Sequence, residues 1–260
     1  MHRNEALGKI LFGGFVPIVV DDRLPAEACA EQVLAAGLEA VEVSCRHPDA
    51  LAVIGRLKAR LPRLAVGAAS LIEDGRYLEH LWAAGRSVPN IKQAADAGAD
   101  FLVSMLPFRQ PTYERFSRTH VTIPGVATPG EAQQALDWGA NLMKFCSPHL
   151  LGGPAFFRGI DAASHRGFPF FTTGGIRPKV IDDYVEAQVL VFAAGFDIIL
   201  GDAYAQMAQQ FAPERLGEAL GAYVAAIREA RKRHQGHIPF DSKDAAAIAA
   251  ASGRCLNEGV

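Results

Sequence analysis

The sequence has few cysteines, and they are far apart. Four occur among 260 residues, at Cys29, Cys45, Cys146 and Cys255, without a C-x-x-C pair or the cysteine and histidine spacing of a metal site. Scattered cysteines in a chain of this length are typical of reduced thiols in an intracellular protein. We therefore expect a cytoplasmic protein that binds no metal.

Long apolar runs and an excess of positive charge are also absent. No apolar run reaches about 18 residues without a polar break, which argues against a membrane span, and the N-terminus resembles no signal peptide. The formal net charge of −2 lacks the positive excess that is typical of proteins that bind polyanions. A basic cluster at residues 228–233 ends a predicted helix, where cations favour the helix dipole. We expect neither nucleic acid nor membrane as a partner.

Short apolar runs alternate with helix-like stretches, which predicts parallel β/α units. The eight expected strands are residues 15–20, 39–44, 64–70, 101–104, 121–126, 142–145, 168–172 and 189–193. Eight such units predict an α/β protein with a closed (β/α)8 TIM barrel. An open doubly wound sheet is the alternative, but no G-x-G-x-x-G follows the first strand, which weakens its dinucleotide-binding version.

Two segments exceed the minimal barrel. A long insertion at residues 71–87 follows the third strand; loops there lie on the catalytic face, so it is either a lid or subunit contact, or an extra surface helix. Residues 1–212 are expected to form the barrel with an N-terminal lead-in helix. Residues 213–260 are expected to form a helical C-terminal extension that packs on the barrel or on a neighbouring subunit.

One lysine lies in an unusual position. Lys144 is in the middle of the apolar run Asn141–Cys146, whereas the other lysines have polar or helix-like neighbours. Burial disfavours an ammonium unless it is paired or deprotonated. A lysine whose pKa is lowered by desolvation can attack a carbonyl and form a Schiff base. The alternatives are a lysine that extends to solvent and one that forms a buried ion pair.

The second strand carries a second candidate, Glu42, between two valines. If its face points inward, the buried carboxylate is a candidate general acid or base, or the partner of Lys144 in a structural ion pair. Arg46 follows at the end of this strand. Its planar guanidinium suits a substrate carboxylate, although an arginine at such a place can also be merely solvated.

Other polar and glycine residues fall at the carboxyl ends of strands, which meet at one mouth of a barrel. Ser70 and Thr173 end the third and seventh strands and can donate hydroxyl hydrogen bonds. Gly174 and Gly175 follow, and they free backbone amides to approach an anion.

Four segments, in this order along the chain, resemble the class I aldolases for 2-keto-3-deoxy-6-phosphogluconate and 4-hydroxy-2-oxoglutarate, the KDPG/KHG aldolase family. Val41–Arg46 resembles the family's L-E-V-T-x-R, and Pro124–Glu131 resembles P-G-V-A-T-P-x-E. Leu142–Phe145 matches L-x-K-F, and Thr173–Pro178 matches T-G-G-I-x-P. The similarity extends from residue 15 to residue 196.

The resemblance implies a Schiff-base lyase that cleaves a 2-keto-3-deoxy sugar acid or 4-hydroxy-2-keto acid to pyruvate and an aldehyde. Lys144 would form the imine, and Glu42 would move protons through water. Arg46 would hold the carboxylate of the pyruvyl part, and Thr173 would line the site. The resemblance further implies no metal, no cofactor beyond the covalent imine, a small 2-keto acid as substrate, and a homotrimer.

The sequence departs from the family pattern after four strands. Just beyond Lys144, Phe145–His149 replaces F-F-P-A-E. Gly67–Ser70 replaces G-A-G-T and keeps a hydroxyl, whereas Ser104–Leu106 replaces S-P-G. Ala193–Gly195 replaces the G-G-S of the phosphate loop, and Asp197 close behind disfavours an anion. Gly174 and Gly175 keep one half of the phosphate cradle, whereas the half that ends at Gly195 is altered. Whether the substrate is phosphorylated therefore stays open.

Two other functions are compatible with a barrel of this kind. One is a sugar-phosphate isomerase or epimerase that uses Glu42 as its base. The other is a binding or scaffold protein that keeps the barrel without turnover; the altered loops favour it, and the Glu42–Lys144 pair argues against it.

Overall fold

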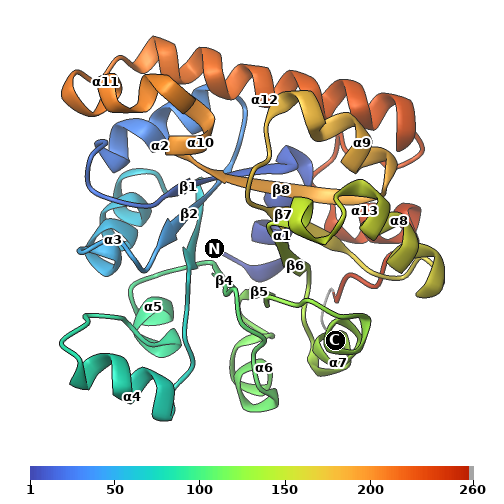
Figure 1. The fold of residues 1–260 in the computed structure, drawn as a ribbon, viewed down its shortest axis with the longest axis horizontal. Coiled ribbons are helices and arrows are strands. Elements are labelled where there is room, and N and C mark those ends of the chain that lie inside the picture. Colours follow the sequence, from blue (N-terminus) through green and yellow to red (C-terminus); the bar gives the residue numbers. More distant parts are fainter. Residues whose placement is uncertain (258–260) are drawn as a thin grey trace.

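The computed structural model describes residues 1–257, and eight parallel strands form its central barrel (Figure 1). The strands are β1 (Phe15–Val19), β2 (Ala40–Ser44), β3 (Ala65–Ala69), β4 (Phe101–Val103), β5 (Val121–Ile123), β6 (Met143–Cys146), β7 (Phe170–Thr173) and β8 (Val189–Gly195). Their order is β5-β4-β3-β2-β1-β8-β7-β6. The gap between β5 and β6 is closed by an isolated bridge between Gly125 and Lys144. The predicted barrel is confirmed, and the open sheet was wrong.

Helices surround the strands (Figure 1). They are α2 (Ala26–Ala35), α3 (Ala50–Arg60), α4 (Arg76–Ala83), α5 (Ile91–Asp96), α6 (Gln110–Phe116), α7 (Pro129–Trp138), α8 (Pro154–Ala163), α9 (Ile181–Glu186), α10 (Phe196–Leu200), α11 (Tyr204–Gln209) and α12 (Pro213–His234), with α1 (Arg3–Gly13) and α13 (Ala245–Ser252) near the ends of the chain. Short 3-10 turns are η1 (Pro148–Leu151), η2 (Pro178–Val180) and η3 (Gly201–Ala203).

The two-residue period of the strands divides the apolar side chains into two cores. Val41, Val43 and Phe145 belong to the outer core, between strands and helices. Ala40 and Phe171 belong to the inner core, in the barrel interior. The residues that lie between outer-core positions along β2 and β6 therefore point inward.

The N-terminal end of the barrel is closed by apolar side chains. Leu7, Ile10 and Leu11 of α1 are fully buried and join the inner core, as do Ile248 and Ala249 of α13. Burial of a leucine or isoleucine contributes roughly 1.5–3 kcal/mol. This end is therefore a packed plug, which leaves the carboxyl ends of the strands for chemistry.

The segments outside the minimal barrel are helical. The insertion after β3 contains α4, and its residue Glu73 forms an ion pair with Arg109 after β4, with 2.9 Å between Oε2 and Nε. In the C-terminal part, α12 packs against α2 and α9, and α13 packs against α1. Residues 258–260 of the expected extension lie outside the described residues. Among the helices of residues 1–257, none has the length and apolar character needed to cross a membrane.

Candidate active site

Lys144 and Glu42 face each other across the barrel interior. In the strand order, three strands separate β2 from β6 in each direction, so the two side chains come from opposite walls. Lys144 Nζ lies 3.7 Å from Glu42 Oε2, and the two side chains are 4% and 0% exposed. This distance is too long for a hydrogen bond. The pair is therefore buried and in electrostatic contact, but no hydrogen bond fixes it.

The Glu42 carboxylate is an unusual buried group. Neither of its oxygens has a hydrogen-bond partner among residues 1–257. Burial raises the pKa of Glu42, and the nearby Lys144 opposes this rise. An unsatisfied buried polar group costs about 1–3 kcal/mol. A carboxyl group with a raised pKa beside a lysine has the properties of a proton carrier.

Two further side chains surround the amine. Lys144 Nζ lies 5.7 Å from the ring centroid of Phe171, which is its register partner on β7. This distance is within the range of about 6 Å for a cation–π contact. Cys146 lies two residues beyond Lys144 on β6, and burial raises the pKa of its thiol. Sequence reasoning missed both residues, although the two-residue period that links Phe171 to Thr173 was available as a signal.

A chain of hydrogen bonds links three residues at the ends of β2 and β3. Ser44 Oγ lies 3.0 Å from Ser70 Oγ, and Arg46 Nε donates to Ser44 Oγ at 3.1 Å. Ser70 adopts a left-handed backbone with φ 58°. Ser44 is buried on the same strand face as Glu42, whereas Arg46 is exposed. The structure thus brings Arg46 and Ser70 together through Ser44.

The Thr173–Gly175 segment contacts the loop that follows β6. The Ser147 amide donates to the Thr173 carbonyl at 2.7 Å. Gly174 and Gly175 have φ angles of 93° and 70°, and a Cβ atom on Gly174 would lie 2.9 Å from Ser147 Oγ. One on Gly175 would lie 3.1 Å from His149 Nδ1. Glycines are required here because the conformation is left-handed and the approach is close.

Gly195 has different neighbours. It is buried at the end of β8, and a Cβ atom there would overlap the carboxylate of Asp197 and lie 3.1 Å from Val20. The Asp197 carboxylate therefore lies against Gly195, on the side where a side chain would project.

The Pro124–Glu131 segment has structural contacts on both sides. Gly125 pairs with Lys144, and a Cβ atom at Gly125 would overlap the backbone of Met105. Thr128 and Glu131 form a capping box at the start of α7. The motif thus positions the backbone of Lys144 and begins the next helix.

Among residues 1–257, no group of three or more His, Cys, Asp or Glu side chains has an arrangement that could hold a metal ion.

Known proteins are similar to this chain in sequence. The family model described as "KDPG and KHG aldolase" matches residues 13–209. A 2-dehydro-3-deoxy-phosphogluconate aldolase of Zymomonas mobilis is 28% identical over 178 residues, which are 68% of this chain and 78% of that protein. A KHG/KDPG aldolase of Escherichia coli is 26% identical over 203 residues, which are 77% of this chain and 88% of that protein.

Solved structures share the fold. A KDPG aldolase from Legionella pneumophila, with pyruvate captured as a covalent carbinolamine intermediate, has a TM-score of 0.67 at 22% identity. The similarity covers 85% of this chain and 98% of that chain.

Proposed function

Because the chain belongs to the KDPG and KHG aldolase family, which consists of carbon–carbon lyases, we propose that it is a Schiff-base aldolase that acts through Lys144. It cleaves a 2-keto-3-deoxy sugar acid or a related 4-hydroxy-2-keto acid to pyruvate and an aldehyde. The observation that carries the proposal is the buried amine of Lys144, 3.7 Å from the Glu42 carboxylate. The isomerase and the non-catalytic barrel are not favoured, because the matching family and relatives are aldolases.

The chemistry follows from the two side chains. The free amine of Lys144 attacks the C2 carbonyl, and the resulting carbinolamine loses water after Glu42, acting through a water molecule, protonates its hydroxyl. The protonated imine then accepts the electron pair of the C3–C4 bond while the C4 hydroxyl gives its proton, through water, to the Glu42 carboxylate, which releases the aldehyde. Glu42 returns this proton to C3 of the enamine, and hydrolysis of the imine releases pyruvate. The imine itself is the electron sink, so the proposed reaction needs neither a metal nor a further cofactor.

We assign the carboxylate of the pyruvyl part to Arg46. The supporting observation is its contact with Ser44, whose Oγ lies on the inward face of β2, two residues beyond Glu42. A guanidinium held at its Nε still offers N–H donors to a carboxylate. Ser70 and Thr173 would supply further hydroxyl donors.

For the far end of the substrate we propose hydroxyl groups instead of a phosphate. Asp197 lies over Gly195. Like charges about 4 Å apart repel by about 4 kcal/mol at an effective dielectric of 20. Asp197 is exposed, and exposed charges interact by only about 0.2–1 kcal/mol. Gly174 and Gly175 still leave backbone amides for hydroxyl oxygens.

We also propose that the enzyme is a cytoplasmic homotrimer. Several large apolar side chains on loops after β3, β4 and β6 are exposed, and they are Tyr77, Trp82, Met105, Leu106, Leu150 and Leu151. Contiguous exposed apolar patches mark protein contacts, and these side chains are our candidates for the subunit contact. The four cysteines are free thiols, as in a reducing compartment. Light scattering after size-exclusion chromatography measures the oligomeric state.

Replacement of Lys144 tests the function. Pyruvate release, coupled to lactate dehydrogenase, should fall at least about 10³-fold in Lys144→Arg, because a guanidinium keeps the charge but forms no Schiff base. Lys92→Arg, on an exposed lysine paired with Asp96, is the matched control and should retain full activity. Activity within tenfold of the wild type in Lys144→Arg would refute the proposal.

A further inference from the structure

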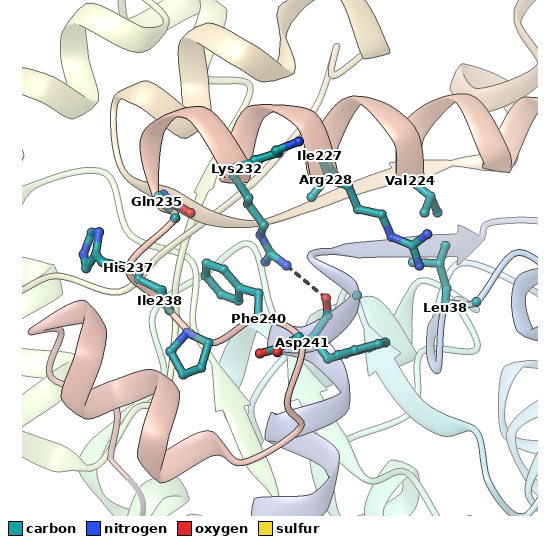
Figure 2. A pocket seen from close by; sticks show the side chains of 16 residues that line it. Leu38, Val224, Ile227, Arg228, Lys232, Gln235, His237, Ile238, Phe240 and Asp241 are labelled. Carbon is teal, nitrogen blue, oxygen red and sulfur yellow. Dashed lines mark hydrogen bonds between the residues drawn. The ribbon is translucent and has the colours of Figure 1, made fainter.

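A hollow of about 780 Å³ lies at the end of the barrel opposite to the Lys144 mouth. It is formed by the last turns of α12, the segment 235–241, and the residues just before β1 and β2 (Figure 2). Small-molecule sites typically measure about 300–1,000 Å³. Because each strand residue rises about 3.3 Å, the five residues of β1 keep this hollow and the mouth well apart.

The floor of the hollow is apolar. Leu38, Val224, Ile227 and Ile238 are buried around it, and the half-buried ring of Phe240 joins them. Figure 2 shows Val224 and Ile227 on the helix, with Ile238 and Phe240 on the segment that follows it. A flat apolar group could therefore contact both elements.

The charged residues of the hollow are unbalanced. Three cations, Arg228, Arg231 and Lys232, line it together with one carboxylate, Asp241, which gives a formal surplus of 3 − 1 = +2. Within residues 1–257 the ion pairs include none of these three cations. The C-terminal end of α12 contributes only about −0.5 elementary charge. A positive surplus remains.

Arg231 is 6% exposed, although it has no counter-ion in the described part of the chain. Its guanidinium donates to the backbone carbonyls of Leu11, Phe12 and Leu190. It also stacks on Phe240, with 3.6 Å between Cζ and the ring centroid. Burial lowers the pKa of Arg231 to about 9. The carbonyls explain how Arg231 caps α1, but they do not neutralise its charge.

Two polar atoms of the lining are unsatisfied as well. Arg231 Nε and Gln235 Oε1 are buried without a hydrogen-bond partner among residues 1–257. Buried polar atoms in native proteins normally have partners, and exceptions occur at binding sites whose ligand or water is absent. Unsatisfied atoms, surplus charge and an apolar floor thus coincide in one hollow.

We propose that this hollow binds a small organic anion, with a flat apolar body and one carboxylate, sulfonate or phosphate group. The apolar body lies against Ile227, Ile238 and Phe240. The anionic group lies toward Arg228 and Lys232 at the rim, where it also offsets the charge of Arg231. The site is independent of the aldolase centre and of the function proposed for it.

The probe for this site is 8-anilinonaphthalene-1-sulfonate, titrated into the full chain in the presence of saturating pyruvate. Its fluorescence should saturate at one molecule per chain. The double variant Arg228→Gln/Lys232→Gln should weaken binding by about tenfold or more, because charge-assisted contacts are lost. Both residues are exposed, so the fold and the pyruvate-releasing activity should be retained.

Arg215→Gln is the matched control, because Arg215 is an exposed arginine of the same helix outside the hollow and donates to Gln206. It should bind the probe as the wild type does. Naphthalene-1-sulfonate should displace the probe at a concentration at least about tenfold lower than sulfate, because its rings bury apolar area. Absence of saturable binding, equal affinity in the double variant, or sulfate as effective as naphthalenesulfonate would overturn the proposal.

Discussion

The substitution Glu42→Gln tests whether Glu42 transfers protons, because it removes the carboxylate and leaves the shape of the site unchanged. The substitution preserves the length of the side chain and removes the carboxylate that lies 3.7 Å from Lys144 Nζ. The change breaks no hydrogen bond, because both carboxylate oxygens lack partners among the described residues. We expect kcat/KM for cleavage to fall by about 10²–10⁴-fold, the usual contribution of a positioned general acid–base group. This loss corresponds to about 2.7–5.4 kcal/mol of transition-state stabilisation.

The pH profile gives a second signature of the same residue. Burial raises the pKa of Glu42 above the ordinary value of 4.5. A raised pKa means that Glu42 takes up its proton at a higher pH than an ordinary glutamate when the solution is acidified. If the carboxylate form is the working base, log kcat/KM of the wild type should fall with decreasing pH around a midpoint above 4.5. This acid limb should be absent in Glu42→Gln.

Pyruvate release measured across the pH range, with lactate dehydrogenase assayed separately at each pH, provides both quantities. Glu39→Gln is the control, because Glu39 lies just before the same strand and pairs with Lys243 away from the mouth, with 2.7 Å between Oε2 and Nζ. It should change kcat/KM by less than about twofold, because Glu39 lies at the opposite end of β2 from the mouth. A Glu42→Gln enzyme with more than a tenth of wild-type activity and an unchanged acid limb would refute the assignment.

Two further predictions concern substrate choice and packing. Asp197→Ser should raise kcat/KM for a phosphorylated 2-keto-3-deoxy acid by up to about fivefold relative to its unphosphorylated counterpart, because a carboxylate beside Gly195 is removed; an unchanged ratio of the two kcat/KM values would contradict the proposed substrate class. Gly67→Ala should lower the free energy of unfolding in urea by about 1–3 kcal/mol, because its Cβ would overlap the ring of Phe101. Gly130→Ala, where the added methyl group meets nothing, should show no such loss, and equal effects of the two substitutions would contradict this packing.

The strands could be predicted from the sequence because each is a short apolar run with its own turn residues. The predicted ends of the strands were less accurate where the backbone, and not the side chains, ends the strand. The fifth strand was expected to reach Val126, but β5 ends at Ile123. Pro124 has no amide hydrogen to continue the ladder, and Gly125 forms only an isolated bridge with Lys144.

The sequence could predict that Glu42 and Lys144 face each other. Each lies between apolar residues on a strand, and closure of a barrel turns both faces toward one axis. The contacts of Phe171 with Lys144, and of Ser44 with Ser70, depend on the register between neighbouring strands. Register comes from the stagger of the whole barrel, which no single strand encodes.

The hollow at the N-terminal end was beyond prediction for a similar reason. Its lining comes from residues 12–13, 37–38 and 224–241, which are far apart in the sequence. The basic cluster at residues 228–233 indicated only a favourable helix end. The surplus charge of the hollow became apparent only from the fold, which buries Arg231 without an ion-pair partner among residues 1–257.

Reduction with sodium borohydride in the presence of pyruvate, followed by mass measurement of the peptide that contains residue 144, tests directly whether Lys144 forms the imine. We expect a permanent adduct on Lys144, with the mass of a reduced pyruvyl group, together with loss of activity. An unmodified Lys144 at saturating pyruvate, or an adduct on another lysine with activity retained, would contradict it.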